Sequence, residues 1–352
     1  WHGGEPLMRS IDFYKKALEL QKKYAHGKQI DNVIQTNGTL LTDEWCEFFA
    51  QNHFLVGISI DGPQEYHDHY RQTFAGKPSW EKVMHGIHLL KKHRVEWNAM
   101  AVVNAYNAEH PLEFYHFFRD NGCQYLQFTP IVERLTEHED GRTLASLADV
   151  SHEDNYEDVG NAKKQKENQE ITIADFSVTP EQWGKFLCTI FDDWVRHDVG
   201  KIFVEIFDCT LANWIGVQPG ICAYSKECGH AGVMEHNGDV FSCDHFVFPE
   251  YKLGNIQDKS LIDMLYGEKQ QAFSRLKHTS LPRQCKECDM EFACHGECPK
   301  NRFDRDKYGE PGLNYLCKGY YEYYTHVAPY MDFMKRELQT QRPPANIMNV
   351  LK

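Results

Sequence analysis

Eight of the twelve cysteines of this chain lie between residues 222 and 317. They are Cys222, Cys228, Cys243, Cys285, Cys288, Cys294, Cys298 and Cys317. Thiolates are ligands of zinc and of iron–sulfur clusters, so this concentration predicts a metal-binding region. The other four, Cys46, Cys123, Cys188 and Cys209, stand singly in apolar surroundings, where cysteine usually acts as a small buried side chain.

The eight cysteines could form disulfides, bind zinc or bind iron–sulfur clusters, and their spacing favours some of these over others. Disulfides are the weakest interpretation, because the chain is long, opens with no charged and apolar leader, and has a Cys-x-x-Cys pair at 285–288. Two four-cysteine zinc sites would use every thiolate, but a zinc ribbon repeats short Cys-x-x-Cys knuckles, whereas residues 285–298 read C-x2-C-x5-C-x3-C. Iron–sulfur clusters take four thiolates each and tolerate mixed spacings. Two clusters are the leading interpretation, and zinc stays open.

Five features of this region occur together. They are Cys222, Asn237-Gly238 in a tight turn, Cys243 shortly after it, the run CKECDMEFACHGEC at 285–298, and a final Cys317. This set resembles the SPASM domain of radical S-adenosylmethionine enzymes. Cys228 and the sequence SCDH at 242–245 are similar to the anaerobic sulfatase-maturating enzymes within that superfamily. The resemblance extends over nearly the whole chain.

The resemblance implies how the cysteines are shared between two auxiliary [4Fe–4S] clusters. One cluster would be held by Cys222, Cys228, Cys243 and Cys298. The other would be held by Cys285, Cys288, Cys294 and Cys317. Spacing alone allows many other partitions. Because four thiolates leave no open iron, both clusters would transfer electrons or organise the domain rather than bind S-adenosylmethionine.

Asp244 follows Cys243 directly and would lie beside the first cluster. In the resembling enzymes the matching acid takes a proton from the substrate, and a carboxylate buried near an anionic cluster would accept one readily. The implied reaction is oxidation of a Cys or Ser in an unfolded sulfatase segment to Cα-formylglycine. S-adenosylmethionine, reduced by a third [4Fe–4S] cluster, would supply the 5′-deoxyadenosyl radical that removes hydrogen from the β-carbon. An auxiliary cluster would accept the second electron.

The chain begins WHGGEP, in which Gly3 and Gly4 precede Glu5. Glycines let a backbone approach a ligand closely, and Glu5 places a carboxylate beside them. On its own this triplet also fits a plain turn with an acid at a helix start. In the resembling family it is the motif that holds the amino group of S-adenosylmethionine. Gly3, Gly4 and Glu5 are therefore predicted cofactor ligands.

Three further residues are implied by the same resemblance. Ser59, near the end of a predicted strand, and Arg71, in the predicted loop HDHYR after it, would bind the carboxylate of S-adenosylmethionine. The planar fork of arginine suits that group. Val132 would pack on the adenosine. Taken alone, Arg71 fits a solvated loop charge and Val132 fits a core valine.

The elements that position these residues alternate between helix and strand. Predicted helices cover 6–24, the residues after the cap Thr42, 79–93 and 111–121; predicted strands cover 33–40, 54–63, 96–104 and 125–132. This alternation predicts an α/β fold with a parallel sheet and right-handed crossovers. The resemblance narrows it to a partial (β/α)6 radical SAM barrel, truncated at its N-terminus, with active residues at the carboxyl ends of the strands.

The second half predicts a cysteine-rich α+β domain. Asn237-Gly238 between alternating stretches indicates a hairpin, a short helix starts after Ser260, and a tyrosine-rich helix follows Cys317, with order ending at Pro343. The predicted domains are the barrel at 1–200, the SPASM domain with two cluster sites at 201–318, and a C-terminal helix and tail at 319–352.

An acidic insert at about 135–170 interrupts the predicted barrel. Its runs HEDNYEDV and KKQKENQE carry few large apolar residues, so the segment cannot bury enough surface to fold alone. A solvated excursion is the simpler interpretation, and a flap over the barrel mouth is the alternative.

The composition excludes some partners. The chain has 51 acidic and 38 basic side chains, a net charge of −13, which argues against sequence-independent nucleic-acid binding. Its longest apolar runs fall short of the roughly 20 residues that span a bilayer. Many free thiols without a leader predict a reducing, cytoplasmic location.

The chain departs from the family in one respect. The radical-generating cluster needs a C-x3-C-x2-C motif, which does not occur in this sequence. We therefore expect an upstream segment with the ligands of the third cluster, and no turnover by the 352 residues alone; natural loss of the motif is the alternative. The expected partners are an unfolded or nascent sulfatase and an electron donor such as flavodoxin or ferredoxin. Rival functions are another SPASM peptide maturase and a non-enzymatic module with two zinc sites.

Overall fold

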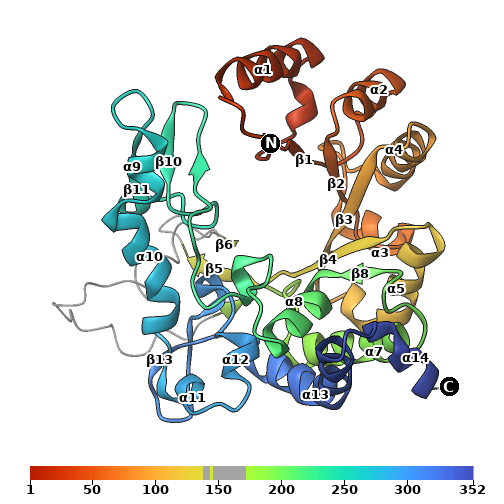
Figure 1. The fold of residues 1–352 in the computed structure, drawn as a ribbon, viewed down its shortest axis with the longest axis vertical. Coiled ribbons are helices and arrows are strands. Elements are labelled where there is room, and N and C mark those ends of the chain that lie inside the picture. The colour runs from red at the N-terminus through yellow and green to blue at the C-terminus, as the bar shows by residue number, and fades with distance from the viewer. Residues whose placement is uncertain (138–142, 146–171, 352) are drawn as a thin grey trace. The chain divides into compact units, whose positions relative to one another are not determined.

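The computed structural model describes residues 1–137, 143–145 and 172–351 (Figure 1). The chain forms two compact units. The first comprises Trp1–Pro130 with Asp192–Glu205, and the second Ile131–Phe191 with Ile206–Lys352. The predicted domain boundaries stay a prediction, and the two units are described separately below.

The first unit is built on a parallel sheet, which confirms the α/β prediction. Its strands in the described chain are β1 (Val33–Thr36), β2 (Leu55–Ser59), β3 (Glu96–Val103), β4 (Tyr125–Pro130) and β8 (Phe203–Val204), adjacent in that order. Each is parallel to its neighbour, with Ile34 opposite Val56 and Ser59 opposite Met100. All the carboxyl ends therefore meet at one edge of the sheet, where parallel α/β folds bind ligands.

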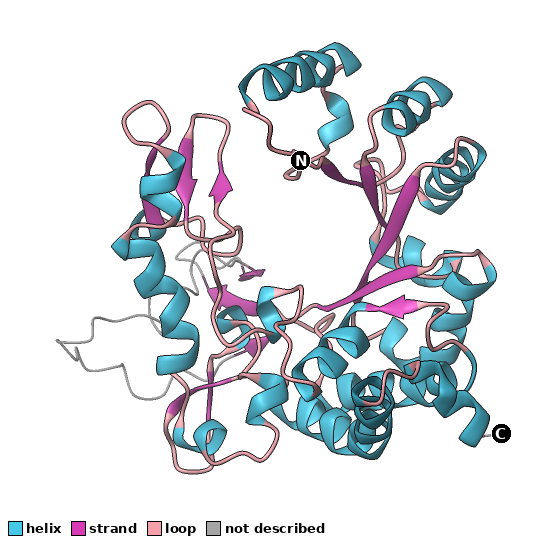
Figure 2. Cartoon of the chain, viewed as in Figure 1, coloured by secondary structure: helices cyan, strands magenta, loops and turns pink. Residues whose placement is uncertain are grey.

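Helices join and cover these strands (Figure 2). They are α1 (Ile11–Tyr24), α2 (Asp43–Gln51), α3 (Gln64–Tyr70), α4 (Trp80–Lys92) and α5 (Pro111–Asp120). Thr42 caps α2 as predicted, because its hydroxyl accepts the N–H of Trp45 at 3.3 Å. Burial on both faces explains the apolar strands: in β2, Val56 and Ile58 on one face and Gly57 on the other are all buried.

Two local predictions for this unit were wrong. The helix expected over 6–24 is a short 3-10 turn, η1 (Pro6–Met8), followed by α1, which starts after Ser10. The loop expected before Arg71 is helix α3, and Arg71 is its C-terminal cap.

The backbone of Trp1 lies beside β1. Its terminal amino group donates to Val33 O at 2.6 Å, and its carbonyl accepts the N–H of Gln35 at 3.0 Å. This is the pattern of a parallel ladder. The following residues therefore reach the carboxyl end of β1, where Gly3, Gly4 and Glu5 lie.

The second unit combines small antiparallel sheets with helices. Its α-helices are α7 (Pro180–His197) up to Phe191, α8 (Glu205–Trp214) from Ile206, α9 (Leu261–Leu265), α10 (Glu268–Thr279), α11 (Arg283–Lys286), α12 (Glu291–Cys294), α13 (Cys317–Gln339) and α14 (Ile347–Val350). Short 3-10 turns are η3 (Cys222–Tyr224), η4 (Pro249–Tyr251), η5 (Pro299–Asn301) and η6 (Pro344–Asn346). The strands between them are β9 (Val233–Met234), β10 (Asp239–Phe241), β11 (Lys252–Asn255), β12 (Asp304–Arg305) and β13 (Pro311–Leu313). The predicted hairpin is confirmed, since β9 and β10 pair antiparallel across the Asn237-Gly238 turn.

Other features of this unit were missed or misplaced. Helices α8 and α10 were not predicted, and the ordered chain continues past Pro343 into η6 and α14, where Ile347 is buried. The ends of the acidic insert form strands β5 (Arg134–Glu137), β6 (Thr143–Ala145) and β7 (Thr172–Ile173) in one antiparallel sheet. The rest of the insert, with both proposed roles, lies outside the described residues.

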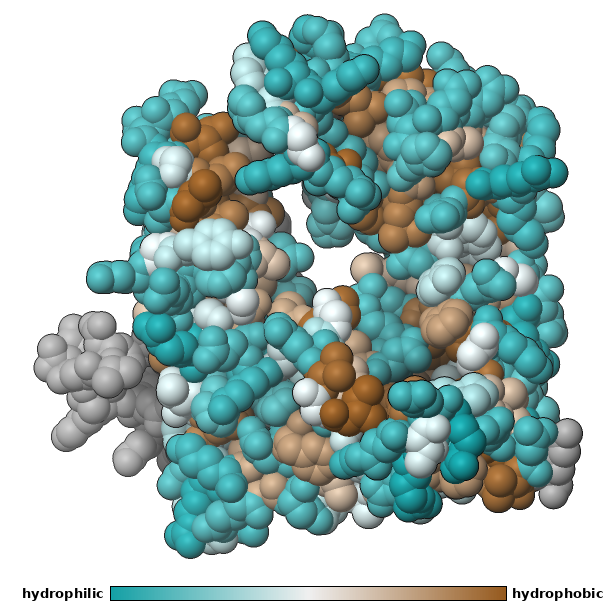
Figure 3. Space-filling model, in the orientation of Figure 1, coloured by the Kyte–Doolittle hydropathy of each residue, from teal (hydrophilic) through white to brown (hydrophobic). Residues whose placement is uncertain are grey.

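None of the described helices is long and apolar enough to cross a membrane. On the face drawn in Figure 3, hydrophilic side chains predominate and hydrophobic ones gather in separate patches.

Candidate cofactor and cluster sites

Glu5 is fixed at the carboxyl end of β1 by three hydrogen bonds. Its Oε1 accepts the Thr36 hydroxyl at 2.7 Å and the Leu7 N–H at 2.9 Å, and its Oε2 accepts the Asn37 N–H at 2.8 Å. Thr36 is buried at the last position of β1. A carboxylate offers about four acceptor positions, so Glu5 can take a further donor such as an amino group.

Gly3 and Gly4 precede this carboxylate with left-handed backbones, at φ +97° and +58°. Both are exposed, and a Cβ built on either residue has no heavy atom within 4 Å. Their conformation, rather than crowding within the chain, therefore requires glycine. The open space beside them leaves the backbone accessible to a ligand.

Ser59 ends β2, next to the end of β1. Its hydroxyl accepts the Gln35 amide at 3.0 Å. A serine hydroxyl that accepts one hydrogen bond can still donate its own proton. Ser59 is half-buried and lies at the same sheet edge as Glu5, as predicted.

Arg71 is held by Asp61, a residue that the sequence did not single out. Its Nε donates to Asp61 Oδ2 at 2.6 Å, while Asp61 Oδ1 accepts the N–H of Val102 at 2.9 Å. The Arg71 side chain stays 29% exposed, whereas that of Asp61 is 4% exposed. The buried acid thus orients the guanidinium and leaves its terminal nitrogens for a ligand. The feature of the sequence that could have indicated Asp61 is the position of this acid two residues after strand β2.

His67 and Ser79 complete this arrangement. The His67 Nδ1 accepts the Asp61 N–H at 3.2 Å, its Nε2 contacts the Ser79 hydroxyl at 3.0 Å, and that hydroxyl donates to Arg71 O at 2.7 Å. This chain of donors requires a neutral imidazole with its proton on Nε2. Burial lowers the pKa of His67 to about 4, against the opposing effect of Asp61.

Val132, the predicted adenosine contact, belongs to the second unit, where its side chain is 3% exposed. It follows β4, which ends at Pro130 rather than at the predicted position 132. Its role stays a prediction.

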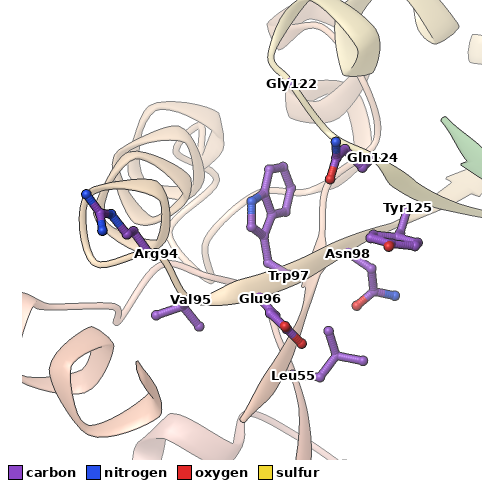
Figure 4. A pocket seen from close by; sticks show the side chains of 9 residues that line it. All are labelled: Leu55, Arg94, Val95, Glu96, Trp97, Asn98, Gly122, Gln124 and Tyr125. Carbon is purple, nitrogen blue, oxygen red and sulfur yellow. The ribbon is translucent and has the colours of Figure 1, made fainter. Parts of the chain in front are cut away.

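A separate hollow of about 590 Å³ lies in the first unit (Figure 4). Its lining includes Leu55, Glu96 and Tyr125, the first residues of β2, β3 and β4. These are the amino ends of the strands, whereas Glu5 and Ser59 lie at the carboxyl ends. The hollow is therefore not part of the candidate cofactor site.

In the second unit, four thiols influence one another's pKa. The pKa of Cys228 is raised to about 11, first by burial and also by Cys222. Burial raises the pKa of Cys298, with a contribution from Cys228, and the pKa of Cys243, with a contribution from Cys298. Cys228 and Cys243 also pack on the apolar cluster of Phe246, Tyr251 and Phe273, which shields them from water. These four thiols form the first group.

The remaining four thiols behave in the same way. Burial raises the pKa of Cys294, with contributions from Cys317 and Cys285. The pKa of Cys317 is raised to about 12 by burial and then by Cys285 and Cys288. Their assignment as the ligands of two separate clusters stays a prediction, and the buried thiols would need a metal to hold them as thiolates.

The arrangement differs from that of a single-ion site. Among the described residues, no three His, Cys, Asp or Glu side chains converge closely enough to hold one metal ion. Tetrahedral zinc would bring its sulfurs to about 3.8 Å from one another, given zinc–sulfur bonds of ~2.3 Å.

Asp244 lies next to the first group, since the Cys243 Sγ donates to its Oδ1 at 3.3 Å. Its side chain is exposed, so the predicted burial of this carboxylate is not found. It follows β10 in a turn, whereas the neighbouring Cys243 packs on the apolar cluster.

Two families match this chain. The radical SAM superfamily matches residues 1–118, and the SPASM iron–sulfur cluster-binding domain matches residues 226–289. The parallel sheet with its motif at the carboxyl edge and the two thiol groups agree with both matches. The fold and site therefore define a radical SAM enzyme with a SPASM domain.

The relatives narrow the class. A serine-type anaerobic sulfatase-maturating enzyme of Bacteroides thetaiotaomicron is 66% identical over all 352 residues, 81% of its own length. A cysteine-type enzyme of Clostridium perfringens is 30% identical, over 94% of this chain and 80% of its own. The structure of native anSMEcpe with bound AdoMet and the Cp18Cys peptide matches with a TM-score of 0.79 at 28% identity, covering 96% of this chain and 85% of that one. The chain belongs to the anaerobic sulfatase-maturating enzymes.

Proposed function

We propose that this protein oxidises a serine in an unfolded sulfatase segment to Cα-formylglycine. The observation that carries the choice of serine is the 66% identity, along the entire chain, to a relative named as serine-type. The cysteine-type relatives are more distant, at about half that identity.

The first unit would hold S-adenosylmethionine by its amino acid end. Glu5 and the backbone of Gly3 and Gly4 would bind the amino group, and Ser59 and Arg71 would bind the carboxylate. The fit rests on the open backbone at the glycines and on the guanidinium that Asp61 orients. Val132 would contact the adenosine.

The second unit would hold two auxiliary [4Fe–4S] clusters on the thiol groups described above. When bound, S-adenosylmethionine and the clusters supply radical hydrogen abstraction and electron transfer. Converting the serine –CH2OH to –CHO removes two hydrogens, that is, two protons and two electrons. Asp244 would accept the proton of the substrate hydroxyl, and its exposure makes it accessible to that group. Flavodoxin or ferredoxin would supply the reducing electrons.

The test compares two preparations under anaerobic conditions. One is the 352-residue chain, and the other carries an added N-terminal segment with a C-x3-C-x2-C motif. Each receives S-adenosylmethionine, a reductant and a sulfatase peptide with serine, or with cysteine, at the target position. We expect only the extended protein to turn over and the serine peptide to lose two hydrogens by mass spectrometry.

The role of Asp244 is tested in the extended protein by Asp244→Asn. We expect the rate to fall by roughly 10²–10⁴-fold, the usual contribution of a general base, with cluster content retained. Asp258→Asn, an exposed acid of the same unit, is the matched control and should keep the full rate. Equal rates for the two variants would remove Asp244 from the mechanism.

Oxidation of the cysteine peptide alone would show a cysteine-type enzyme. Modification of neither peptide, with clusters and cofactor bound, would favour a SPASM maturase acting on another peptide.

A further inference from the structure

Two cations, Lys277 and Arg302, are buried in the second unit between the segments that carry the cysteines. Lys277 on α10 is 0% exposed and Arg302 is 3% exposed. Among the residues that the structure describes, neither forms an ion pair, and both bind backbone carbonyls. The buried carboxylate of Glu297, which accepts the Asn314 amide at 2.8 Å, interacts electrostatically with both cations. One carboxylate does not balance two buried cations, so a further anion that binds there would offset the cost of their burial.

The ammonium group of Lys277 lies among the backbone carbonyls of the turn that carries Cys222. Its Nζ donates to the carbonyls of Cys222, Ala223 and Ser225. Three acceptors match the three donors of an ammonium, so these bonds favour the charged form, whereas burial lowers the pKa of Lys277. One turn earlier on the same helix, Ser274 O accepts the N–H of Cys228 at 3.4 Å. One helix therefore positions two cysteines of the first group and places a positive charge beside them.

Arg302 holds the link between the two thiol groups. The link, residues 295–297, joins Cys294 of one group to Cys298 of the other. All three link residues have left-handed backbones, with φ +48°, +69° and +55° in chain order. Two of them are not glycine, so the conformation is strained.

The strained link turns its carbonyls toward one guanidinium. Arg302 donates to the carbonyls of His295 at 2.7 Å, Gly296 at 2.8 Å and Glu297 at 2.9 Å, and to that of Lys277. The last bond connects the two cations through one backbone carbonyl. A Cβ at Gly296 would lie 2.4 Å from Leu281 Cδ2 and 2.6 Å from Arg302 Nη2, so these two side chains fill the space that a larger residue would need.

We propose that Lys277 is a positioning residue that makes the cluster of Cys222, Cys228, Cys243 and Cys298 the more easily reduced of the two auxiliary clusters, while Arg302 lies on the link between both groups. This inference rests on the proposed ligand sets. A four-thiolate cluster is anionic and gains a further negative charge on reduction, so a fixed nearby cation favours the reduced state. Lys277 touches the backbone of the first group only, which makes the effect unequal.

The test measures reduction potentials by a titration monitored by electron paramagnetic resonance, with iron and sulfide analysis on each protein. Lys277→Gln keeps two N–H donors but removes the charge. We expect it to keep both clusters and to disfavour reduction of the first cluster at least tenfold, a shift of ~59 mV to more negative potential. Lys286→Gln, which removes an exposed charge next to Cys285, is the matched control and should leave the first cluster unchanged.

Cys317→Ser, which removes a ligand of the second group, identifies the signal of the first cluster. An unshifted potential in Lys277→Gln, or an equal shift in Lys286→Gln, would overturn the inference. If Lys277→Gln fails to fold, the reduction potentials of the two clusters in the unmodified protein still test the proposal. A first cluster with a more negative potential than the second would contradict it. Absence of two clusters in the unmodified protein would instead reject the proposed ligand sets.

Discussion

At the scale of single residues, each candidate cofactor ligand of the first unit depends on a neighbour that fixes it. Thr36 and Asn37 hold Glu5, and Asp61 holds Arg71. The ligand types were predictable from short motifs. Their supports were not, because a threonine or an aspartate after a strand has many ordinary roles until the fold brings it to a partner.

The neutral His67 makes stability depend on pH. Its unfolded pKa is about 6.5, and burial, opposed by Asp61 and Asp68 and aided by Arg71, lowers it to about 4 in the fold. The unfolded chain therefore takes up the proton first, so this contribution is complete at neutral pH and is lost as the pH falls from about 6.5 to 4. We expect protonation of His67 to lower the free energy of unfolding by about 2 kcal/mol between pH 7 and pH 4.5.

This effect is measured by urea unfolding at both pH values. His67→Gln should be less stable than the unmodified protein at pH 7 and should lose less stability on acidification. His236→Gln, at an exposed site, is the control and should behave as the unmodified protein does. An identical loss for all three proteins would exclude His67 as the source.

At the scale of elements, the four strands β1 to β4 were predicted best, because short apolar runs that end at turn residues are typical of buried strands, whereas other strands such as β8 and β11 were missed. Their ends were less accurate: β1 stops at Thr36 rather than at residue 40, since Asn37 and Gly38 turn away. Helix α10 was missed because its sequence EKQQAFSRLKHT is mostly polar, although Gln270, Ser274 and Lys277 are buried on it. Its buried face packs Phe273 on Phe246 and Tyr251 and forms hydrogen bonds to loops distant in the sequence, which no local pattern records.

Helices α7 and α13 cross closely within the second unit at Gly184 and Gly319. A Cβ at Gly319 would collide with Pro180 O and lie 2.9 Å from Gly184 N. We expect Gly319→Ala to cost about 1–3 kcal/mol, as overpacking does, and to displace the first turn of α13, which carries Cys317. Thermal unfolding and iron content measure both effects.

Thr325→Ala on the exposed side of α13 is the control and should change neither quantity by much. A Gly319→Ala protein with unmodified stability would show that the two helices are not tightly packed at this crossing.

At the scale of the whole molecule, the class of protein followed from the eight cysteines and the alternation of helix and strand. The contacts of the three-residue link between Cys294 and Cys298 did not, because its left-handed backbone binds Arg302, a residue outside the cysteine motif. The spacing of the cysteines does not indicate the role of Arg302, which follows Cys298 in the sequence.

The two groups predict the iron content of the molecule. The reconstituted 352-residue chain should hold about eight irons, two clusters of four, and Cys222→Ala should lose about four of them. Cys46 is a buried cysteine outside both groups, so Cys46→Ala is the control and should retain all of the iron. Iron and sulfide analysis decides between these outcomes, and zinc in place of iron would contradict the assignment.

The small sheet at the ends of the acidic insert has a practical consequence. Strand β5 leads into the insert and β7 leads out of it, and they pair directly, with Leu135 opposite Thr172. The entry and exit of the insert are thus held side by side by main-chain hydrogen bonds, and closing a chain between two fixed points depends only weakly on its length. A fluorescent protein or an affinity handle inserted between them would leave the flanking strands in register, which makes this position a suitable fusion point for purifying or imaging the enzyme.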